Sequence, residues 1–274
     1  ALDPRGRQVI PIEGPAMNDS LIHERDGALV RLRFNRPEVL NALDVQTAEA
    51  FLAACEAIHD DPEVRCVVLS GEGRAFMAGG DLAQLRVAPL ATANALIGPL
   101  HEALELLAEM NAPVVAALQG AVAGAGLSMA LAADFAIAAE GTRFNLAYVN
   151  LGTSCDLGSS WSLPRMVGLR KALEIALLGD SFDAAEAQRL NLVNRVVPAE
   201  SLAAEVDALA LRLASSAPQA IGQIKRLMRH SHERPLAVQL AAEQKAFQAC
   251  AVTNDFSEGL AAFFDKRPAR FRGR

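Results

Sequence analysis

The stretch Gly120-Ala121-Val122-Ala123-Gly124-Ala125-Gly126-Leu127-Ser128-Met129-Ala130 decides the fold of this chain. The apolar run Val114 to Leu118 before it is typical of a buried strand, and the run rich in Ala, Leu and Met after it predicts a helix that ends near Ala133. A helix that begins directly after a glycine-rich turn has backbone N–H groups without intrahelical partners, at the end where the helix dipole is positive. We therefore expect this turn to hold negative charge.

Strands and helices alternate on both sides of this stretch. Residues Leu21 to Asp26 and Ala28 to Phe34 predict a hairpin around Asp26-Gly27, and Asp44 is a plausible N-cap for a helix that runs to about His59. Further strands are expected at 65–70, 134–138, 142–144 and 193–197, and further helices at 92–110, 159–167, 170–178 and 181–190. Such alternation predicts crossover units, and the wholly helical pattern after Ser201 predicts a separate carboxyl-terminal segment.

Composition sets the broad class of the protein. The chain has 274 residues, of which 51% are hydrophobic, so it can bury a large core. Its net charge of −6 and pI near 5.5 argue against nucleic acid as the main partner. No apolar run approaches the roughly 18 residues that a membrane span requires.

The cysteines and the amino-terminal residues bear on location. Cys55, Cys66, Cys155 and Cys250 lack metal-ligand spacing, so we expect reduced thiols, no metal site and a cytoplasmic protein. Residues 1–17 carry three prolines and several charges, which predicts a disordered tail without a signal peptide. Met17 is a candidate natural start.

Seven motifs occur in the order typical of one family. They are Asn35-Arg36-Pro-Glu-Val-Leu-Asn41-Ala-Leu43, Arg74-Ala-Phe-Met-Ala-Gly-Gly-Asp81-Leu82, Ala112-Pro113-Val-Val-Ala-Ala-Leu-Gln-Gly120-Ala-Val-Ala-Gly124-Ala-Gly126, Ala133-Asp134-Phe-Ala-Ile-Ala, Leu163-Pro164-Arg165-Met-Val-Gly168, Leu192-Val193-Asn-Arg195-Val-Val and Phe264-Asp-Lys266-Arg267-Pro. Over Leu21 to Phe271 the chain resembles the crotonase, or enoyl-CoA hydratase/isomerase, superfamily. The resemblance implies an α/β fold: a spiral of ββα units over residues 18–200, then a helical trimerisation or lid segment over 201–274 that builds a homotrimer or hexamer.

The resemblance also implies an acyl-CoA substrate whose thioester oxygen is held by two backbone N–H groups. By position in the motifs, these donors belong to Gly80 and Ala125. Such a donor pair stabilises an enolate and commonly supplies a large part of the rate enhancement. Ala125 stands where many members have a second glycine, but an alanine amide still donates. No metal or cofactor is implied, since coenzyme A is part of the substrate.

Two residues depart from the pattern of the hydratases. Members that hydrate a double bond carry two glutamates, one on the helix after the glycine turn and one after the strand-end phenylalanine, matched here to Phe144. This chain has Ser128 and Tyr148 at those positions. Neither is a carboxylate, and a tyrosine has a reference pKa of about 10. The usual hydratase machinery is therefore absent.

One carboxylate remains in the right region, Asp156 in Asp156-Leu-Gly158-Ser-Ser-Trp161-Ser-Leu163-Pro164. An aspartate before a helix can be a simple N-cap. By resemblance, an acid at this position is the single base of the double-bond isomerases, and the run looks especially like the phenylacetate-pathway isomerases. Asp156 would then take a proton from the α-carbon and return it at the γ-carbon. In an apolar closed pocket its pKa should be raised, which suits that task.

Three alternatives stay open at this point. In the 4-chlorobenzoyl-CoA dehalogenase branch an aspartate here is a nucleophile, assisted by a helix histidine and a ring-nitrogen donor. His101 and Tyr148 occupy about the positions of these two assisting groups. His101 can also be an ordinary exposed helix residue. The others are a hydratase with a displaced base and a non-catalytic acyl-CoA-binding protein.

The resemblance also assigns residues to coenzyme A. Arg36 would lie near its phosphates or adenine, although Arg36 can equally be a solvated loop residue. Lys266 would meet the phosphates, as a basic residue at this position does in the family, sometimes across a subunit boundary. The backbone of Val39 and Leu40, and of Ala78 to Leu82, would line the adenine and pantetheine path. Asp81 lies at a loop-to-helix junction and is expected to be a cap. Trp161 is expected in the core, and acyl-pocket residues are expected at 82–100 and around Leu146.

Overall fold

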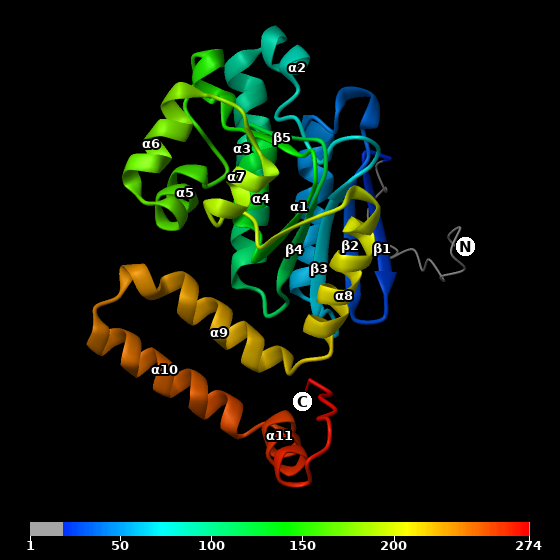
Figure 1. The fold of residues 1–274 in the computed structure, drawn as a ribbon, viewed down its shortest axis with the longest axis vertical. Helices are drawn as coiled ribbons and strands as arrows, with labels where there is room; N and C mark the ends of the chain where they lie inside the picture. The colour runs from blue at the N-terminus through cyan, green and yellow to red at the C-terminus, as the bar shows by residue number, and fades with distance from the viewer. Residues whose placement is uncertain (1–18, 274) are drawn as a thin grey trace.

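The computed structural model describes residues 19–273, and Figure 1 shows strands enclosed by helices. The expected tail at residues 1–17 lies outside the described residues. Within them, the main sheet has six strands in the order β1-β2-β3-β4-β6-β9. They are β1 (Leu21–Asp26), β2 (Leu29–Phe34), β3 (Cys66–Gly71), β4 (Val114–Leu118), β6 (Phe135–Ala139) and β9 (Arg195–Val197). The β1–β2 pair is the predicted antiparallel hairpin, and the pairings from β2 to β9 are parallel.

A second, smaller sheet has the order β5-β7-β8. Its strands are β5 (Ala121–Ala123), β7 (Arg143–Asn145) and β8 (Phe182–Asp183). β5 lies inside the stretch predicted as a turn, and β8 lies inside a predicted helix, so that α7 (Ala184–Arg189) begins later than expected. Strands of two or three residues are too short to show a period of two in the sequence.

The chain repeats one unit: a strand of the main sheet, a short pairing in the second layer, then a helix. β3 leads to the parallel bridge between Met77 and Val122 and then to α2 (Leu82–Val87) and α3 (Pro89–Glu109). β4 leads to β5 and α4 (Ala125–Ala132), and β6 leads to β7 and α5 (Ser159–Val167). This repeat confirms the predicted α/β spiral of ββα units.

The other helices are α1 (Val45–His59), α6 (Leu169–Leu178), α8 (Leu202–Ala214), α9 (Pro218–His230), α10 (Leu236–Ala251) and α11 (Asn254–Phe264), with short 3-10 turns at Pro37–Val39, Ala147–Leu151, Ala199–Ser201 and Ser231–Glu233. The side chain of Asp44 caps α1 as predicted, by accepting the Thr47 N–H at 2.8 Å. No helix in residues 19–273 is both long and apolar enough to cross a membrane.

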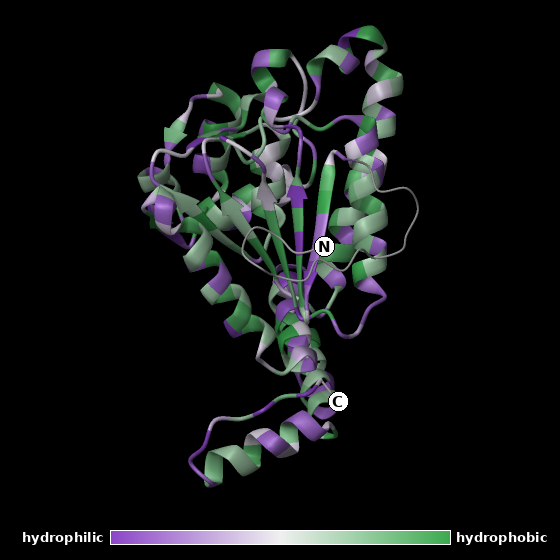
Figure 2. Cartoon of the chain, turned by 90° about the vertical axis from the view of Figure 1, so that its right-hand side faces the viewer, coloured by the Kyte–Doolittle hydropathy of each residue, from purple (hydrophilic) through white to green (hydrophobic). Residues whose placement is uncertain are grey.

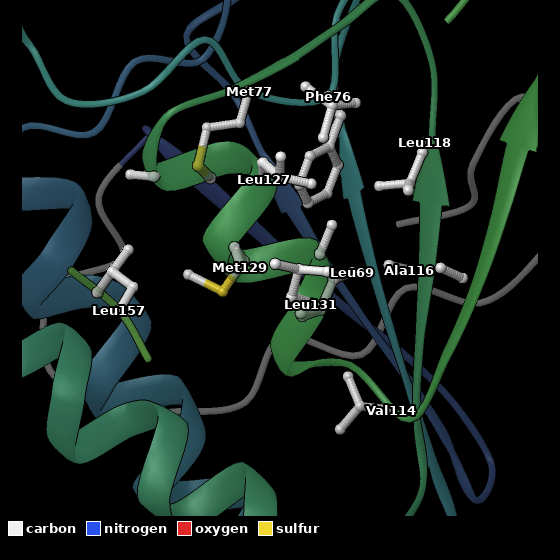
Figure 3. Close-up of a cluster of buried hydrophobic side chains, with 14 of the residues drawn as sticks. Leu69, Phe76, Met77, Val114, Ala116, Leu118, Leu127, Met129, Leu131 and Leu157 are labelled. Carbon is white, nitrogen blue, oxygen red and sulfur yellow. The ribbon is translucent and has the colours of Figure 1, made fainter. Parts of the chain in front are cut away.

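Successive side chains of a strand point to opposite faces of the sheet, and helices cover both faces of the main sheet. One face packs on α1, α3 and α4, and Figure 3 shows its centre, where Leu127 and Leu131 of α4 point toward the sheet and Met129 points to the opposite side of the helix. On the other face Val115 and Ala117 pack against Leu202 and Val206 of α8. A parallel sheet covered on both sides explains why its strands read as continuous apolar runs.

The carboxyl-terminal helices form an arm that extends away from the sheets (Figures 1 and 2). α9 is joined to the core by Asp134, whose carboxylate lies 3.0 Å from Lys225 Nζ and 2.7 Å from Arg229 Nη2. Lys225 Nζ also donates to the carbonyls of Leu107 at 2.6 Å and Ala112 at 3.0 Å, so this buried ammonium is fully satisfied. Asp134 is therefore a structural residue that fastens α9 to the core.

We predict that Gly126→Ala destabilises the fold and that Gly98→Ala does not. A Cβ at Gly126 would lie 2.2 Å from the carbonyl oxygen of Met77, whereas one at Gly98, inside α3, meets nothing within 4 Å. The first change should lower the free energy of unfolding by about 1–3 kcal/mol or more, as overpacking does. The second should raise it by up to about 1 kcal/mol, because alanine favours a helix interior. Equal unfolding midpoints in urea for the two variants would contradict this account.

Candidate active site

The site forms where residues 74–80 lie against the turn that opens α4. The Phe76 N–H donates to Gln119 O at 2.7 Å, and the Ala123 N–H donates to Met77 O at 2.9 Å. Two glycines allow this approach: a Cβ at Gly120 would lie 1.9 Å from Arg74 O, and one at Gly126 would strike Met77 O. Gly120 also has a φ of +59°, which an L side chain rarely adopts.

Within residues 19–273, the backbone N–H groups of Gly80 and Ala125 make no hydrogen bond to the protein, and those of the neighbouring Gly79 and Gly126 also make none. Gly80 pairs with Leu43 in a parallel bridge, in which Leu43 bonds Gly79 O and Asp81 N, so the Gly80 amide points away from that partner. Ala125 is the first residue of α4 and cannot bond within its helix. A Cβ built on Gly79 would lie 4.0 Å from Ala125 N, so the two predicted donors belong to touching segments.

The loop of residues 36–44 supports the Gly80 amide. The Ala78 N–H donates to Leu40 O at 3.0 Å, and Leu40 and Asn41 both have positive φ. Asn41 is buried, and its Nδ2 donates to the carbonyls of Glu72 and Ala75 at 3.0 and 2.8 Å. Asn41 was not predicted as a site residue, yet it joins this loop to the segment that carries Gly80.

Arg36 is half-buried and its guanidinium is already engaged. It lies 3.0 Å from Asp81 Oδ2 and 3.3 Å from Asp44 Oδ2, and it donates to Ala42 O at 2.6 Å. Asp81 is the N-cap of α2, as expected, because its Oδ1 accepts the Ala83 N–H at 3.0 Å. Burial acts to raise the pKa of Asp81, but the Arg36 hydrogen bond and the backbone amides hold it below its ordinary value. Contact of Arg36 with coenzyme A stays a prediction.

The other residues assigned to coenzyme A fall into two groups. Val39 and Leu82 flank the Gly80 loop and are 40% and 52% exposed, so apolar surface is open to a ligand there. Lys266 follows α11, which lies at the far end of the molecule from α2 (Figure 1). One chain therefore does not bring Lys266 to Gly80, and a role for it requires a second subunit.

A chain of hydrogen bonds links the residues at the two hydratase positions to Asp156. Ser128 Oγ lies 3.0 Å from the Tyr148 hydroxyl, and that hydroxyl donates to Asp156 Oδ1. Ser128 is fully buried and Tyr148 is 9% exposed. Because Asp156 accepts from a hydroxyl, its carboxylate form is stabilised while its second oxygen keeps capacity to accept.

Burial sets the acid–base character of the hydrogen-bonded residues Tyr148 and Asp156. It raises the pKa of Asp156, and the hydrogen bond from Tyr148 acts in the opposite direction. It also raises the pKa of Tyr148, and the neighbouring Asp156 carboxylate adds to that shift. Tyr148 is therefore a neutral donor, and Asp156 has the raised pKa that the sequence predicted.

The side chain of Asp156 is not a helix cap. The N-cap of α5 is Gly158, which makes no side-chain cap bond, and only the backbone carbonyl of Asp156 accepts the Ser159 N–H, at 3.2 Å. Leu157 has a φ of +50° and Gly158 one of +71°. A non-glycine residue in this region costs roughly 1–2 kcal/mol, so the turn that carries Asp156 is held by its surroundings.

His101 of α3 is one of the groups that hold this turn. Its Nε2 accepts the Leu157 N–H at 3.2 Å, which makes it the unprotonated nitrogen of the ring. The sequence placed His101 near Asp156 but did not predict this backbone contact. Trp161 was predicted in the core, which is wrong: it is 38% exposed on α5, and the Arg165 guanidinium lies 4.1 Å from its ring centroid. The Arg165 guanidinium thus covers the exposed face of the Trp161 ring in a cation–π contact at the surface.

Comparison with known proteins identifies the family. A model of the enoyl-CoA hydratase/isomerase family matches residues 24–274. The chain is 34% identical to a 1,2-epoxyphenylacetyl-CoA isomerase of Escherichia coli, over 94% of this chain and 100% of that protein. It is 33% identical to a crotonyl-CoA hydratase of Syntrophomonas wolfei, over 92% of this chain and 98% of that protein. An enoyl-CoA hydratase structure from Polaromonas, 36% identical, matches with a TM-score of 0.87 over 92% of this chain and 99% of that one.

We predict that Tyr148→Phe raises the pKa of Asp156 further. The hydroxyl favours the carboxylate form, so its loss makes the proton harder to remove. Carbon NMR titration of aspartate carboxyls, with the Asp156 signal assigned by its loss in Asp156→Asn, measures this shift. Ser128→Ala is the matched control, because Ser128 contacts the tyrosine and not the carboxylate, and its effect should be smaller. An unchanged or lowered Asp156 pKa in Tyr148→Phe would contradict the assigned donor.

Proposed function

The chain belongs to the enoyl-CoA hydratase/isomerase family, and on that premise we propose that it shifts a double bond in an enoyl-CoA thioester, with Asp156 as its single base. One observation carries the proposal: Ser128 and Tyr148 stand at the two hydratase positions, contact each other, and leave Asp156 as the carboxylate of the site. The names of the relatives include both hydratases and isomerases, so the choice between them rests on these side chains.

A single carboxylate suits a proton shuttle. Asp156 takes a proton from the α-carbon of a 3-enoyl thioester, and the C–H electron pair moves into a dienolate. The same carboxyl group then returns the proton at the γ-carbon, which gives the conjugated 2-enoyl thioester. The substrate gains and loses no atoms, so the reaction calls for no cofactor beyond the coenzyme A of the substrate. Burial supports this role, because a base with a raised pKa holds the transferred proton better.

The amides of Gly80 and Ala125 would hold the thioester oxygen while it carries the dienolate charge. Neither amide has an acceptor among the described residues 19–273, and Ala125 also lies at the positive end of the α4 dipole. Donors placed in advance lower the barrier because they do not reorganise during the reaction, and removing one such donor commonly costs about 10²–10³ in kcat. The close packing around Gly120 and Gly126 gives the pair this rigidity.

The dehalogenase-like alternative is less well supported by the site. In that chemistry a histidine would act as an acid–base group, but the Nε2 lone pair of His101 accepts the Leu157 N–H. Tyr148 does offer a hydroxyl donor, yet the hydroxyl is directed at Asp156 itself. A nucleophile held by such a donor would be weakened, because the hydrogen bond stabilises its carboxylate form.

We also propose that the arm of α9 to α11 assembles a trimer, or a hexamer made of two trimers. Phe247, Phe263 and Phe264 are 65%, 77% and 76% exposed, and large apolar side chains gathered on the surface mark interaction sites. Such an assembly would also give Lys266 a route to the coenzyme A of a neighbouring subunit.

We predict for this assembly that Phe263→Glu yields a smaller species than the wild type in multi-angle light scattering. A charge in an apolar interface opposes association. Val87→Glu is the matched control, because Val87 is 83% exposed at the end of α2, away from the arm. A wild-type protein that is monomeric at micromolar concentration would overturn the assembly proposal.

For the reaction, we predict that Asp156→Asn lowers turnover of a 3-enoyl-CoA by about 10²–10⁴-fold, the usual contribution of a positioned general base. Isomerisation raises the conjugated enoyl absorbance, and hydration of crotonyl-CoA lowers it, so one spectrometer separates the two activities. Aromatic and haloaromatic CoA esters complete the panel. Asp180→Asn, an exposed aspartate, is the matched control.

The panel distinguishes the candidate functions. Fast hydration of crotonyl-CoA by the wild type would overturn the isomerase proposal, and halide release from a haloaromatic ester would support the dehalogenase-like alternative instead. If Asp156→Asn keeps full turnover, the base assignment is wrong. Binding of every ester without any turnover would identify an acyl-CoA-binding protein.

A further inference from the structure

The unusual feature beside the base is the backbone of Leu157. Its N–H donates to an imidazole nitrogen of His101, 56 residues earlier in the chain, and not to a carbonyl oxygen. The donor is a main-chain amide, which cannot give up its proton at ordinary pH. The proton of the neutral ring therefore lies on Nδ1, and Nε2 is the acceptor.

This hydrogen bond holds a peptide whose two sides are fixed by other contacts. The Leu157 side chain is 1% exposed and packs in the core near Met129, as Figure 3 shows. On the other side, the Asp156 carbonyl accepts both the N–H and the Oγ of Ser159, at 3.2 and 3.0 Å. His101 thus holds the peptide that directly follows Asp156, in a residue with a φ of +50°. Loss of the acceptor would free that peptide to relax, and the Asp156 carboxylate would move with it.

His101 is also reachable from outside. It borders a cavity of about 370 Å³ between α3, α5 and α9. The charged and titratable groups that line this cavity with His101 are Glu105, Glu109, Arg229, His230 and Glu233, and Asp156 faces His101 from the loop. Several of the cavity groups are paired among themselves: His230 Nε2 lies 3.0 Å from Glu109 Oε1, and Arg229 binds Asp134. A small molecule that enters the cavity can therefore reach the place of the His101 ring.

We propose that His101 is a positioning residue: its neutral imidazole accepts the Leu157 N–H and so sets the direction of the Asp156 carboxylate. The inference rests on the proposed function of Asp156 as the base. It assigns no proton transfer to His101. The role requires only the Nε2 lone pair that accepts the Leu157 N–H.

The test compares His101→Ala, His101→Gln and the wild type on a 3-enoyl-CoA. In His101→Ala we expect kcat to fall by about tenfold to hundredfold, the effect of a misplaced catalytic group, with KM nearly unchanged because the thioester amides are untouched. In His101→Gln the amide Oε1 can accept the Leu157 N–H, so most of kcat should return. Glutamine cannot shuttle a proton, so its activity separates positioning from acid–base catalysis.

Added imidazole gives a second readout. It should restore kcat to His101→Ala, and the restored rate at two pH values should follow the concentration of neutral imidazole and not of total imidazole. His230→Ala is the matched control: it removes a histidine from the same cavity without touching the turn, so kcat should stay at the wild-type level and imidazole should change nothing. Hydrogen exchange of the peptide that contains Leu157 should become faster in His101→Ala alone.

The possible results separate cleanly. Unchanged kcat in His101→Ala, with Asp156→Asn inactive, would overturn the positioning role alone. An inactive His101→Gln would also overturn it, whether or not imidazole restores His101→Ala, because an acceptor alone would then be insufficient. If Asp156→Asn keeps its turnover, the proposed function fails whatever the His101 variants do. If His101→Ala does not fold, the His101→Gln result and its hydrogen exchange decide the question.

Discussion

The site depends on one close approach of two backbones. Residues 74–80 lie against residues 119–126 with no side chain between them, and a Cβ at Gly120 or Gly126 would lie about 2 Å from a carbonyl oxygen, at 1.9 and 2.2 Å. The hydrogen bonds from Phe76 and Ala123 lock the two segments in register. Because the approach is made by main chain, the amides of Gly80 and Ala125 are placed by the fold itself and not by flexible side chains. The rigidity that the proposed oxyanion site requires is therefore a property of the backbone.

The spiral explains how groups that are distant in sequence reach one place. In each repeat of the spiral, the short strand pairing of the second layer is followed closely by a helix start or an irregular loop. Gly80 comes from the first of three successive repeats, Ala125 from the second, and Tyr148 and Asp156 from the third. The second repeat supplies the Ser128 hydroxyl and the third supplies the Tyr148 hydroxyl, at the positions where the resemblance to the hydratases implies glutamates. A neutral hydroxyl pair can hold one carboxylate in a chosen orientation, whereas three carboxylates in the same volume would repel one another and shift their pKa values upward.

Much of the fold could be predicted because its elements are long or clearly punctuated. The β1–β2 hairpin, α1 with its Asp44 cap, and the strand Val114–Leu118 follow from turn chemistry, capping and apolar runs. The misses have local causes. β5 and β8 are too short to show periodicity, and Trp161 is an apolar residue that the packing of α5 left at the surface, under the Arg165 guanidinium. The sequence shows where the glycines lie, but it does not show which backbone atoms they approach.

By itself the sequence determined the family, the repeated ββα order, the two candidate amide donors and the absence of glutamates at positions 128 and 148. These are properties of residue type and spacing along the chain. Only the tertiary structure decided that Asp156 accepts from Tyr148 instead of capping α5, that Arg36 is engaged by Asp44 and Asp81, and that His101 holds a backbone amide. Such contacts depend on how packed elements rotate and where an irregular loop directs its side chains, and neither has a signature in a linear pattern of residues.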